Sequence, residues 1–178
     1  CCLGRGSTSS RLSLHRSSRT RRARPPLQVL LGKDYRLLSL VTVRHPLDSY
    51  ISLVRQKWTH FEPANLEEYA RRYLLFLDDY AGTDLLRYED FVMDPDASMQ
   101  KICTVLQLVW NPDFRTLFSG LDLSGDSGRS SGEIGLRPRR AVAQLILDEI
   151  AQSPAYDQLC ARLEYDPDPE AKVEAGTG

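Results

Sequence analysis

An arginine stands where a predicted strand gives way to a predicted helix. Residues 37–43 are almost continuously apolar and end in β-branched side chains, as in a central strand of a parallel sheet. Arg44 follows directly. Residues 46–58 then read as a helix, because proline is tolerated in a first turn and Asp48 stands where the helix dipole favours an anion. Ser52 lies on this predicted helix, eight residues after Arg44.

This arrangement has two chemical interpretations. In open α/β sheets, ligands bind outside the carboxyl ends of the strands, where a following helix offers unpaired N–H groups to an anion. The planar guanidinium of Arg44 could grip a phosphate with two hydrogen bonds, and the Ser52 hydroxyl could add another. Alternatively, Arg44 pairs with Asp48 and caps the helix. The spacing alone leaves both interpretations open.

The elements that must position these residues alternate between strand and helix. The expected elements after the first helix are a helix at 66–81, a strand at 84–88, and helices at 94–106, from 111, at 138–152 and at 153–163. This alternation predicts an α/β fold with a largely parallel sheet. Cys103 falls on an apolar helix face, which predicts a buried small hydrophobe and not a nucleophile.

Composition narrows the class of protein. A chain of 178 residues with 42% hydrophobic residues can form one domain with its own core. The four cysteines have neither the spacing of a zinc site nor that of a disulfide framework, so we expect no metal. No Gly-rich loop ends in Lys-Ser or Lys-Thr, which argues against a nucleotide kinase. No apolar run approaches the roughly 20 residues of a membrane span, and we expect a cytoplasmic protein.

Residues 1–26 differ in character from the rest. They carry seven arginines and no acidic residue, so that a net charge of −1 combines +7 here with −8 in the remainder. With no aromatic residue and no apolar period, this segment is expected to be disordered. A transit peptide and a nucleic-acid-binding arm both fit its composition. A gene fragment or misread frame fits better, because the first residue is Cys1.

Two motifs resemble those of the sulfotransferase family. The pattern Arg-x-Pro-x-Asp-x-x-x-Ser at 44–52 is similar to the family's 3′-phosphate motif, which implies that Arg44 and Ser52 bind the 3′-phosphate of the sulfate donor. Residues 86–91, Leu-Arg-Tyr-Glu-Asp-Phe, resemble a family strand end whose tyrosine lies near the adenine. That role would fall to Tyr88, for which a plain core position is the alternative.

A third match is looser. Residues 124–131 resemble the family's Gly-rich loop over the 3′-phosphate, where Gly125 and Gly128 would let backbone N–H groups approach and Arg129 would supply charge. The family's Arg-Lys-Gly opening and aromatic-Lys ending are absent. The basic run at 137–140 either helps this loop or is a solvated helix start.

The resemblance covers about residues 37–140 and implies a P-loop-like sulfotransferase fold, with a parallel sheet flanked by helices and truncated at its N-terminal side. We therefore expect a disordered Arg/Ser-rich segment at 1–26, a partial sulfotransferase domain at 27–165 and an acidic flexible tail at 166–178.

The implied function is transfer of a sulfuryl group from 3′-phosphoadenosine-5′-phosphosulfate (PAPS) to a hydroxyl or amine of a small-molecule, glycan or peptide acceptor. No metal, nucleic acid or membrane takes part. The family's Pro-x-Ser-Gly-Thr-Thr loop for the 5′-phosphosulfate does not occur before Arg44, and no histidine stands where the family's base is expected. We assign no catalytic residue and expect this chain alone to be inactive. A non-catalytic nucleotide-binding or interaction fragment is the alternative.

Overall fold

The computed structural model describes residues 27–119, 135 and 139–171. The chain divides into two units, Cys1–Leu37 and Leu38–Gly178. The described part of the first unit contains the short helix α1 (Leu27–Leu31), after which Gly32 takes a positive φ of 73°. Such a glycine is a common way for a helix to end. Every other helix and strand described below belongs to the second unit.

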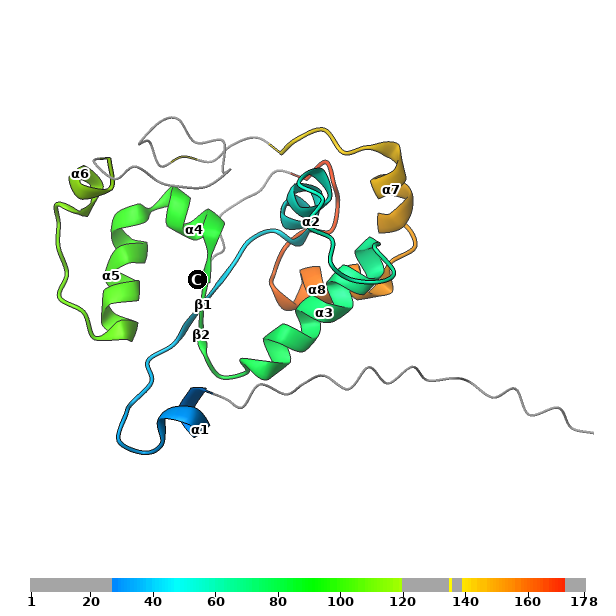
Figure 1. Cartoon of the computed structure of the whole chain (residues 1–178). Coiled ribbons are helices and arrows are strands. Elements are labelled where there is room, and N and C mark those ends of the chain that lie inside the picture. The colour runs from blue at the N-terminus through cyan, green and yellow to red at the C-terminus, as the bar shows by residue number, and fades with distance from the viewer. Residues whose placement is uncertain (1–26, 120–134, 136–138, 172–178) are drawn as a thin grey trace, which may run out of the picture. The chain divides into compact units, whose positions relative to one another are not determined.

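The sheet consists of two parallel strands in the described part of the chain. Strand β1 (Leu40–Val43) pairs with β2 (Asp84–Arg87), with Leu40 opposite Asp84 and Val43 opposite Arg87. Figure 1 shows the two strands side by side in the centre of this unit. The expected parallel pairing is confirmed, and the strands are shorter than the sequence predicted. Because Val43 and Arg87 are paired, the residues that follow them leave the sheet at the same edge.

Helices lie on both sides of the strands. In Figure 1, α4 (Tyr88–Met93) and α5 (Pro95–Leu106) lie on one side, and α3 (Leu66–Asp79) and α8 (Pro154–Arg162) on the other. The remaining helices of this unit are α2 (Pro46–Arg55), α6 (Phe114–Ser119) and α7 (Gln144–Ile150). The described chain is thus a mixed structure of helices around a small parallel sheet. None of the helices that the structure describes is long and apolar enough to cross a membrane.

The main core joins β1 to the helices on the α3 side. Its fully buried members come from α2, α3 and α8 and include Leu47, Leu66, Ala70, Tyr156 and Leu159. On the other side, Leu86 of β2, Val92 of α4 and Cys103 of α5 are buried. The prediction that Cys103 is a buried hydrophobe is confirmed.

Two carboxylates cap helices to which they do not belong. Glu149 of α7 accepts a hydrogen bond of 2.9 Å from the Leu66 N–H at the start of α3. Glu67 of α3 accepts hydrogen bonds from the Ser153 hydroxyl (2.9 Å) and the Ala155 N–H (3.0 Å) at the start of α8. Each carboxylate satisfies an N–H that a helix start leaves unpaired and meets the positive end of the helix dipole. These bonds fix α3, α7 and α8 against one another.

Most of the expected helices occur, with three differences: α1 was not expected, and two more lie further along the chain. The helix expected at 138–152 begins only at Gln144, and residues 139–143 are neither helix nor strand. Helix α4 was not predicted, because residues 88–93 are too few for a helical period to stand out. Gly82, with a φ of 83°, follows α3 as a helix-ending glycine should.

Candidate anion-binding site at the strand ends

Arg44 and Tyr88 lie together at the carboxyl ends of the two strands. The guanidinium carbon of Arg44 is 5.1 Å from the centroid of the Tyr88 ring, within the range of a cation–π contact. The strand register explains this contact, because each residue directly follows one member of the Val43–Arg87 pair. Arg44 is exposed and Tyr88 half-buried. Two residues from separate sequence motifs thus meet where an α/β sheet binds ligands.

The backbone around Arg44 is held from two sides. The buried carboxylate of Glu89 accepts a hydrogen bond of 3.0 Å from the His45 N–H. Burial raises the pKa of the Tyr73 hydroxyl, which also receives a hydrogen bond from the Arg44 backbone. These two contacts hold the backbone of the segment that connects β1 to α2.

His45 is a structural cap for α2. Its ring is 2% exposed, its Nδ1 accepts a hydrogen bond of 3.2 Å from the Leu47 N–H, and its Nε2 donates to the Asp166 carbonyl at 3.1 Å. Burial first, and the positive charge of Arg139 second, lower the pKa of His45, so the neutral ring is favoured. Pro46 has no N–H, and the Leu47 N–H already binds the His45 ring. The start of α2 therefore has fewer unpaired N–H groups for an anion than the sequence predicted.

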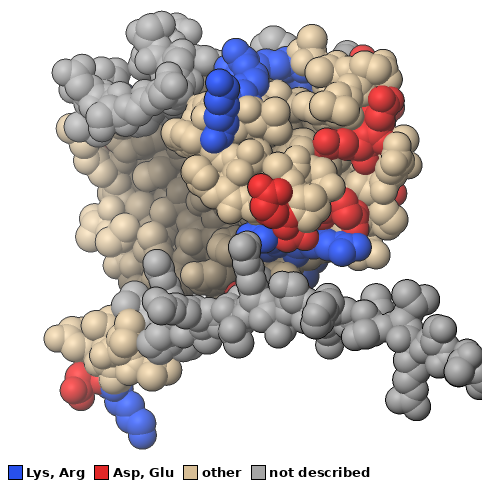
Figure 2. Space-filling model, turned by 45° about the vertical axis from the view of Figure 1, so that its right-hand side comes forward, with Lys and Arg blue, Asp and Glu red and all other residues tan. Residues whose placement is uncertain are grey.

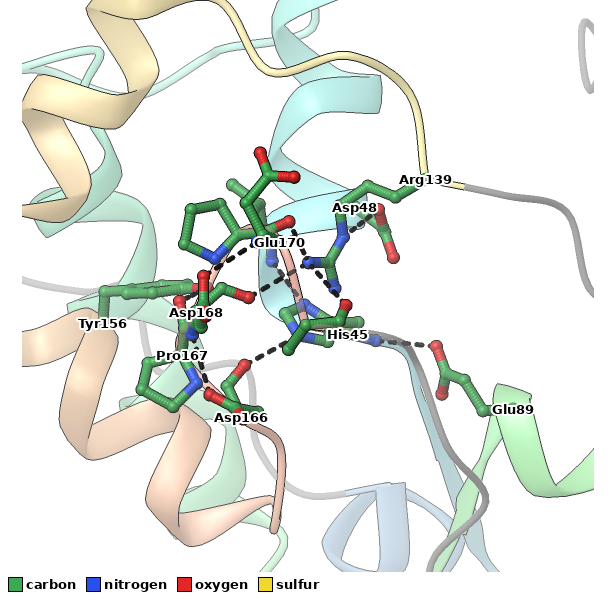
Figure 3. A network of polar contacts seen from close by, with 12 residues as sticks. His45, Asp48, Glu89, Arg139, Tyr156, Asp166, Pro167, Asp168 and Glu170 are labelled. Carbon is green, nitrogen blue, oxygen red and sulfur yellow. Dashed lines mark hydrogen bonds and ion pairs between the residues drawn. The ribbon is translucent and has the colours of Figure 1, made fainter.

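The ion pair of Asp48 excludes one of the two interpretations of Arg44, the Arg44–Asp48 pair. Asp48 Oδ1 lies 3.2 Å from Nε of Arg139, and both side chains are only 9% exposed. Its partner is therefore Arg139 and not Arg44. Arg139 also donates to the carbonyls of Pro169 (2.7 Å) and Asp168 (3.3 Å). Figure 3 shows this side chain between α2 and the C-terminal segment. Arg139 is thus a buried, paired side chain and not a solvated helix start.

The remaining predicted site residues have different outcomes. Ser52 is half-buried on α2, one turn after Asp48. Gly125, Gly128 and Arg129 lie outside the described residues. The structure therefore brings Arg44 into contact with Tyr88, places Ser52 on the adjoining helix, and gives no position for the Gly-rich loop.

Three residues support the segment after β1, and the sequence predicted this role for none of them. They are Glu89, Arg139 and Tyr165, which are far apart in sequence. Glu89 binds the His45 N–H, and Arg139 pairs with Asp48 in the first turn of α2. Tyr165 packs on the His45 ring at a centroid distance of 4.8 Å. Tyr165 also lies under the Arg87 guanidinium at 4.1 Å. An available signal was Glu89 itself, since a carboxylate directly after a buried strand needs a polar partner.

Residues 166–171, which the sequence assigned to a flexible tail, make backbone hydrogen bonds to this same support. The Asp166 carbonyl binds His45, the Pro167 carbonyl accepts from the Tyr156 hydroxyl at 3.2 Å, and Pro169 binds Arg139. Figure 3 shows Asp166 beside His45 and Pro167 beside Tyr156.

The surface charge is mixed on the face drawn in Figure 2, where basic and acidic side chains of the described residues both occur. No group of three or more potential metal ligands occurs among the described residues. Among the described residues, the site at the strand ends is an exposed arginine beside an aromatic ring.

Comparisons with known proteins give one structural resemblance. No protein-family model and no curated protein matches the chain. Among solved structures, it is similar to a sulfotransferase domain from the curacin biosynthetic pathway, with a TM-score of 0.46 and 18% identity. The similarity covers 71% of this chain and 53% of that domain, so the chain spans about half its length. This resemblance assigns no role to any residue.

Proposed function

We propose that this chain binds the 3′-phosphoadenosine part of PAPS, as the nucleotide-binding portion of a sulfotransferase-type domain. The single observation that carries the proposal is the contact of Arg44 with Tyr88 at neighbouring strand ends. Each residue belongs to a separate motif that resembles the sulfotransferase family, and the family resemblance assigns both to the same ligand.

Each residue has a distinct task in this proposal. Arg44 places its planar fork on two oxygens of the 3′-phosphate, and Ser52 adds a hydroxyl donor from α2. Tyr88 offers an aromatic surface to the adenine. Gly125, Gly128 and Arg129 would add backbone N–H groups and charge over the phosphate. Bound PAPS would supply the sulfuryl group that a complete site passes to an acceptor hydroxyl or amine, with no metal required.

A non-catalytic nucleotide-binding protein is the second candidate, and the state of His45 favours it. A general base must reach the acceptor proton through an available nitrogen. Both ring nitrogens of His45 are engaged in hydrogen bonds, and the ring is buried. His45 is therefore unsuited to act as the base, although it directly follows Arg44.

Titration calorimetry with adenosine 3′,5′-bisphosphate and with 5′-AMP tests the proposal, because the two ligands differ only in the 3′-phosphate. We expect the bisphosphate to bind more tightly. Equal affinities would contradict the assignment of Arg44 and Ser52 to that phosphate. Transfer of labelled sulfate from PAPS to hydroxyl and amine acceptors then separates the two candidates, since the non-catalytic protein would bind the nucleotide without turnover.

A further inference from the structure

Glu89 is the most deeply buried carboxylate next to the strand ends. It is 1% exposed and lies in the first turn of α4, directly after Tyr88. Burying an ionised side chain is costly unless hydrogen bonds compensate, so a carboxylate at this position needs a purpose or a set of partners.

The two carboxylate oxygens of Glu89 have different partners. Oε1 accepts the hydrogen bond from the His45 N–H at 3.0 Å, and Oε2 accepts a hydrogen bond from the Tyr165 hydroxyl. Tyr165 in turn packs against the His45 ring and the Arg87 guanidinium, at centroid distances of 4.8 Å and 4.1 Å. The carboxylate is therefore held in place from the C-terminal side and reaches across to the segment after β1.

The Glu89–His45 hydrogen bond lies next to the Arg44–Tyr88 contact along both segments of the chain. Glu89 follows Tyr88 and His45 follows Arg44, so the Glu89–His45 hydrogen bond is one residue beyond the Arg44–Tyr88 contact on both strands. Beyond the last paired residues, Val43 and Arg87, a side chain thus continues the cross-strand connection that the backbone ladder no longer provides.

We infer that Glu89 is a positioning residue for the proposed nucleotide site. Its carboxylate fixes the backbone after Arg44 relative to α4, and so sets the guanidinium over the Tyr88 ring in the orientation that receives the 3′-phosphate. This inference rests on the proposed function for its ligand. The positioning itself is a property of the ligand-free chain and can be measured without a ligand.

Two substitutions separate the reach of the side chain from its charge. Glu89→Gln removes the charge but keeps an oxygen at the same distance for the His45 N–H, while its amide can donate to the Tyr165 hydroxyl. Glu89→Asp keeps the charge but withdraws the carboxylate by one methylene. If positioning is the task, the Gln variant retains it and the Asp variant loses it.

The experiment measures two quantities on each variant. The first is the ratio of affinities for adenosine 3′,5′-bisphosphate and 5′-AMP, by calorimetry. The second is the ring-current shift of the Arg44 side-chain NMR signals in the free protein, referenced to Tyr88→Leu. We expect Glu89→Asp to lower the affinity ratio about tenfold, the equilibrium equivalent of roughly one hydrogen bond, and to lose the shift. Glu89→Gln should keep both within about threefold.

Glu149→Asp is the matched control. Glu149 also accepts two hydrogen bonds, from the Leu66 N–H and the Tyr50 hydroxyl, but it lies on α7. Its shortening should lower thermal stability without changing the affinity ratio or the shift.

Two results would overturn the inference: an unchanged shift in a folded Glu89→Asp protein, or loss of the shift in Glu89→Gln. If the Glu89→Asp protein does not fold, the Glu89→Gln result still tests the inference. A wild type that binds both ligands equally would contradict the proposed function, and the Arg44 shift then decides positioning alone.

Discussion

At the scale of single residues, the two residues that follow β1 differ in exposure and in role. Arg44 is exposed and contacts Tyr88, whereas His45 is buried and caps α2. The sequence predicted Arg44 and Tyr88 as partners in one site, because both follow apolar strands and match motifs. It could not predict the second hydrogen bond of the His45 ring, because its partner, the Asp166 carbonyl, is 121 positions away. The residues proposed to face the ligand could thus be found from local sequence motifs. The contacts that hold them in place join residues far apart in the sequence.

Replacing Tyr88 should weaken nucleotide binding through lost stacking. Removal of one base–aromatic contact is typically worth about 1–3 kcal/mol, so Tyr88→Leu should reduce the affinity for adenosine 3′,5′-bisphosphate by roughly 5- to 150-fold. Tyr88→Phe keeps the ring and should bind nearly as wild type. Tyr80→Leu, at an exposed tyrosine that follows α3, serves as the control. Calorimetry would count against the role of Tyr88 if the Leu variant bound as tightly as Tyr80→Leu.

At the scale of elements, local signals succeeded and long-range pairing did not follow from sequence. The starts of α2, α5 and α8 were predictable because each has a proline in its first turn and a capping side chain before it. The late start of α7 was not predicted. Arg139, which precedes α7, pairs with Asp48, 91 positions away. That buried pair joins α2 to the segment that leads into α7.

Breaking the buried pair should destabilise the fold. Asp48→Asn leaves the Arg139 charge buried without its counter-ion, and such a loss typically costs about 3–5 kcal/mol. Asp78→Asn removes a carboxylate from an ion pair with Arg162 in which Asp78 is 61% exposed, and it should cost less than about 1 kcal/mol. Urea unfolding of both variants measures the difference. Similar free energies of unfolding for the two would show that the Asp48–Arg139 pair does not support the structure.

At the scale of the whole molecule, the sequence predicted a helix-flanked parallel sheet, and the described chain has one of two strands. The order of elements could be predicted because apolar periodicity distinguishes strands from helices. The closing of the C-terminal segment onto the strand ends could not, because it depends on backbone carbonyls at 166–169, which carry no side-chain signal. The hydrogen bonds around His45 therefore both stabilise the fold and hold the segment that carries Arg44.

This network predicts a pH dependence of stability. Burial first, and then Arg139, lower the pKa of His45, although the carboxylates of Asp48 and Glu89 oppose the shift. Below about pH 6.5 the His45 side chain takes up a proton in the unfolded chain but not in the folded chain. The free energy of unfolding therefore decreases as the pH is lowered, until the pH passes below the folded pKa. The loss is at most about 1.4 kcal/mol per pH unit.

The comparison with His45→Asn isolates this effect, because asparagine can accept the Leu47 N–H as a helix cap but does not titrate in this range. Urea unfolding between pH 7 and pH 5 should show the wild type losing stability relative to the variant. Parallel pH profiles for the two proteins would show that His45 does not titrate differently on folding.

The measurement that tests the central claim most directly combines one substitution with two ligands. Arg44→Lys replaces the planar fork by a point charge, while Arg162→Lys makes the same change at an exposed position on α8. Calorimetry of each variant and the wild type with adenosine 3′,5′-bisphosphate and 5′-AMP gives the affinity ratio that the 3′-phosphate contributes. We predict a ratio well above one in the wild type and in Arg162→Lys, reduced about tenfold or more in Arg44→Lys, with 5′-AMP binding unchanged. An Arg44→Lys protein that keeps the full wild-type ratio would contradict the account.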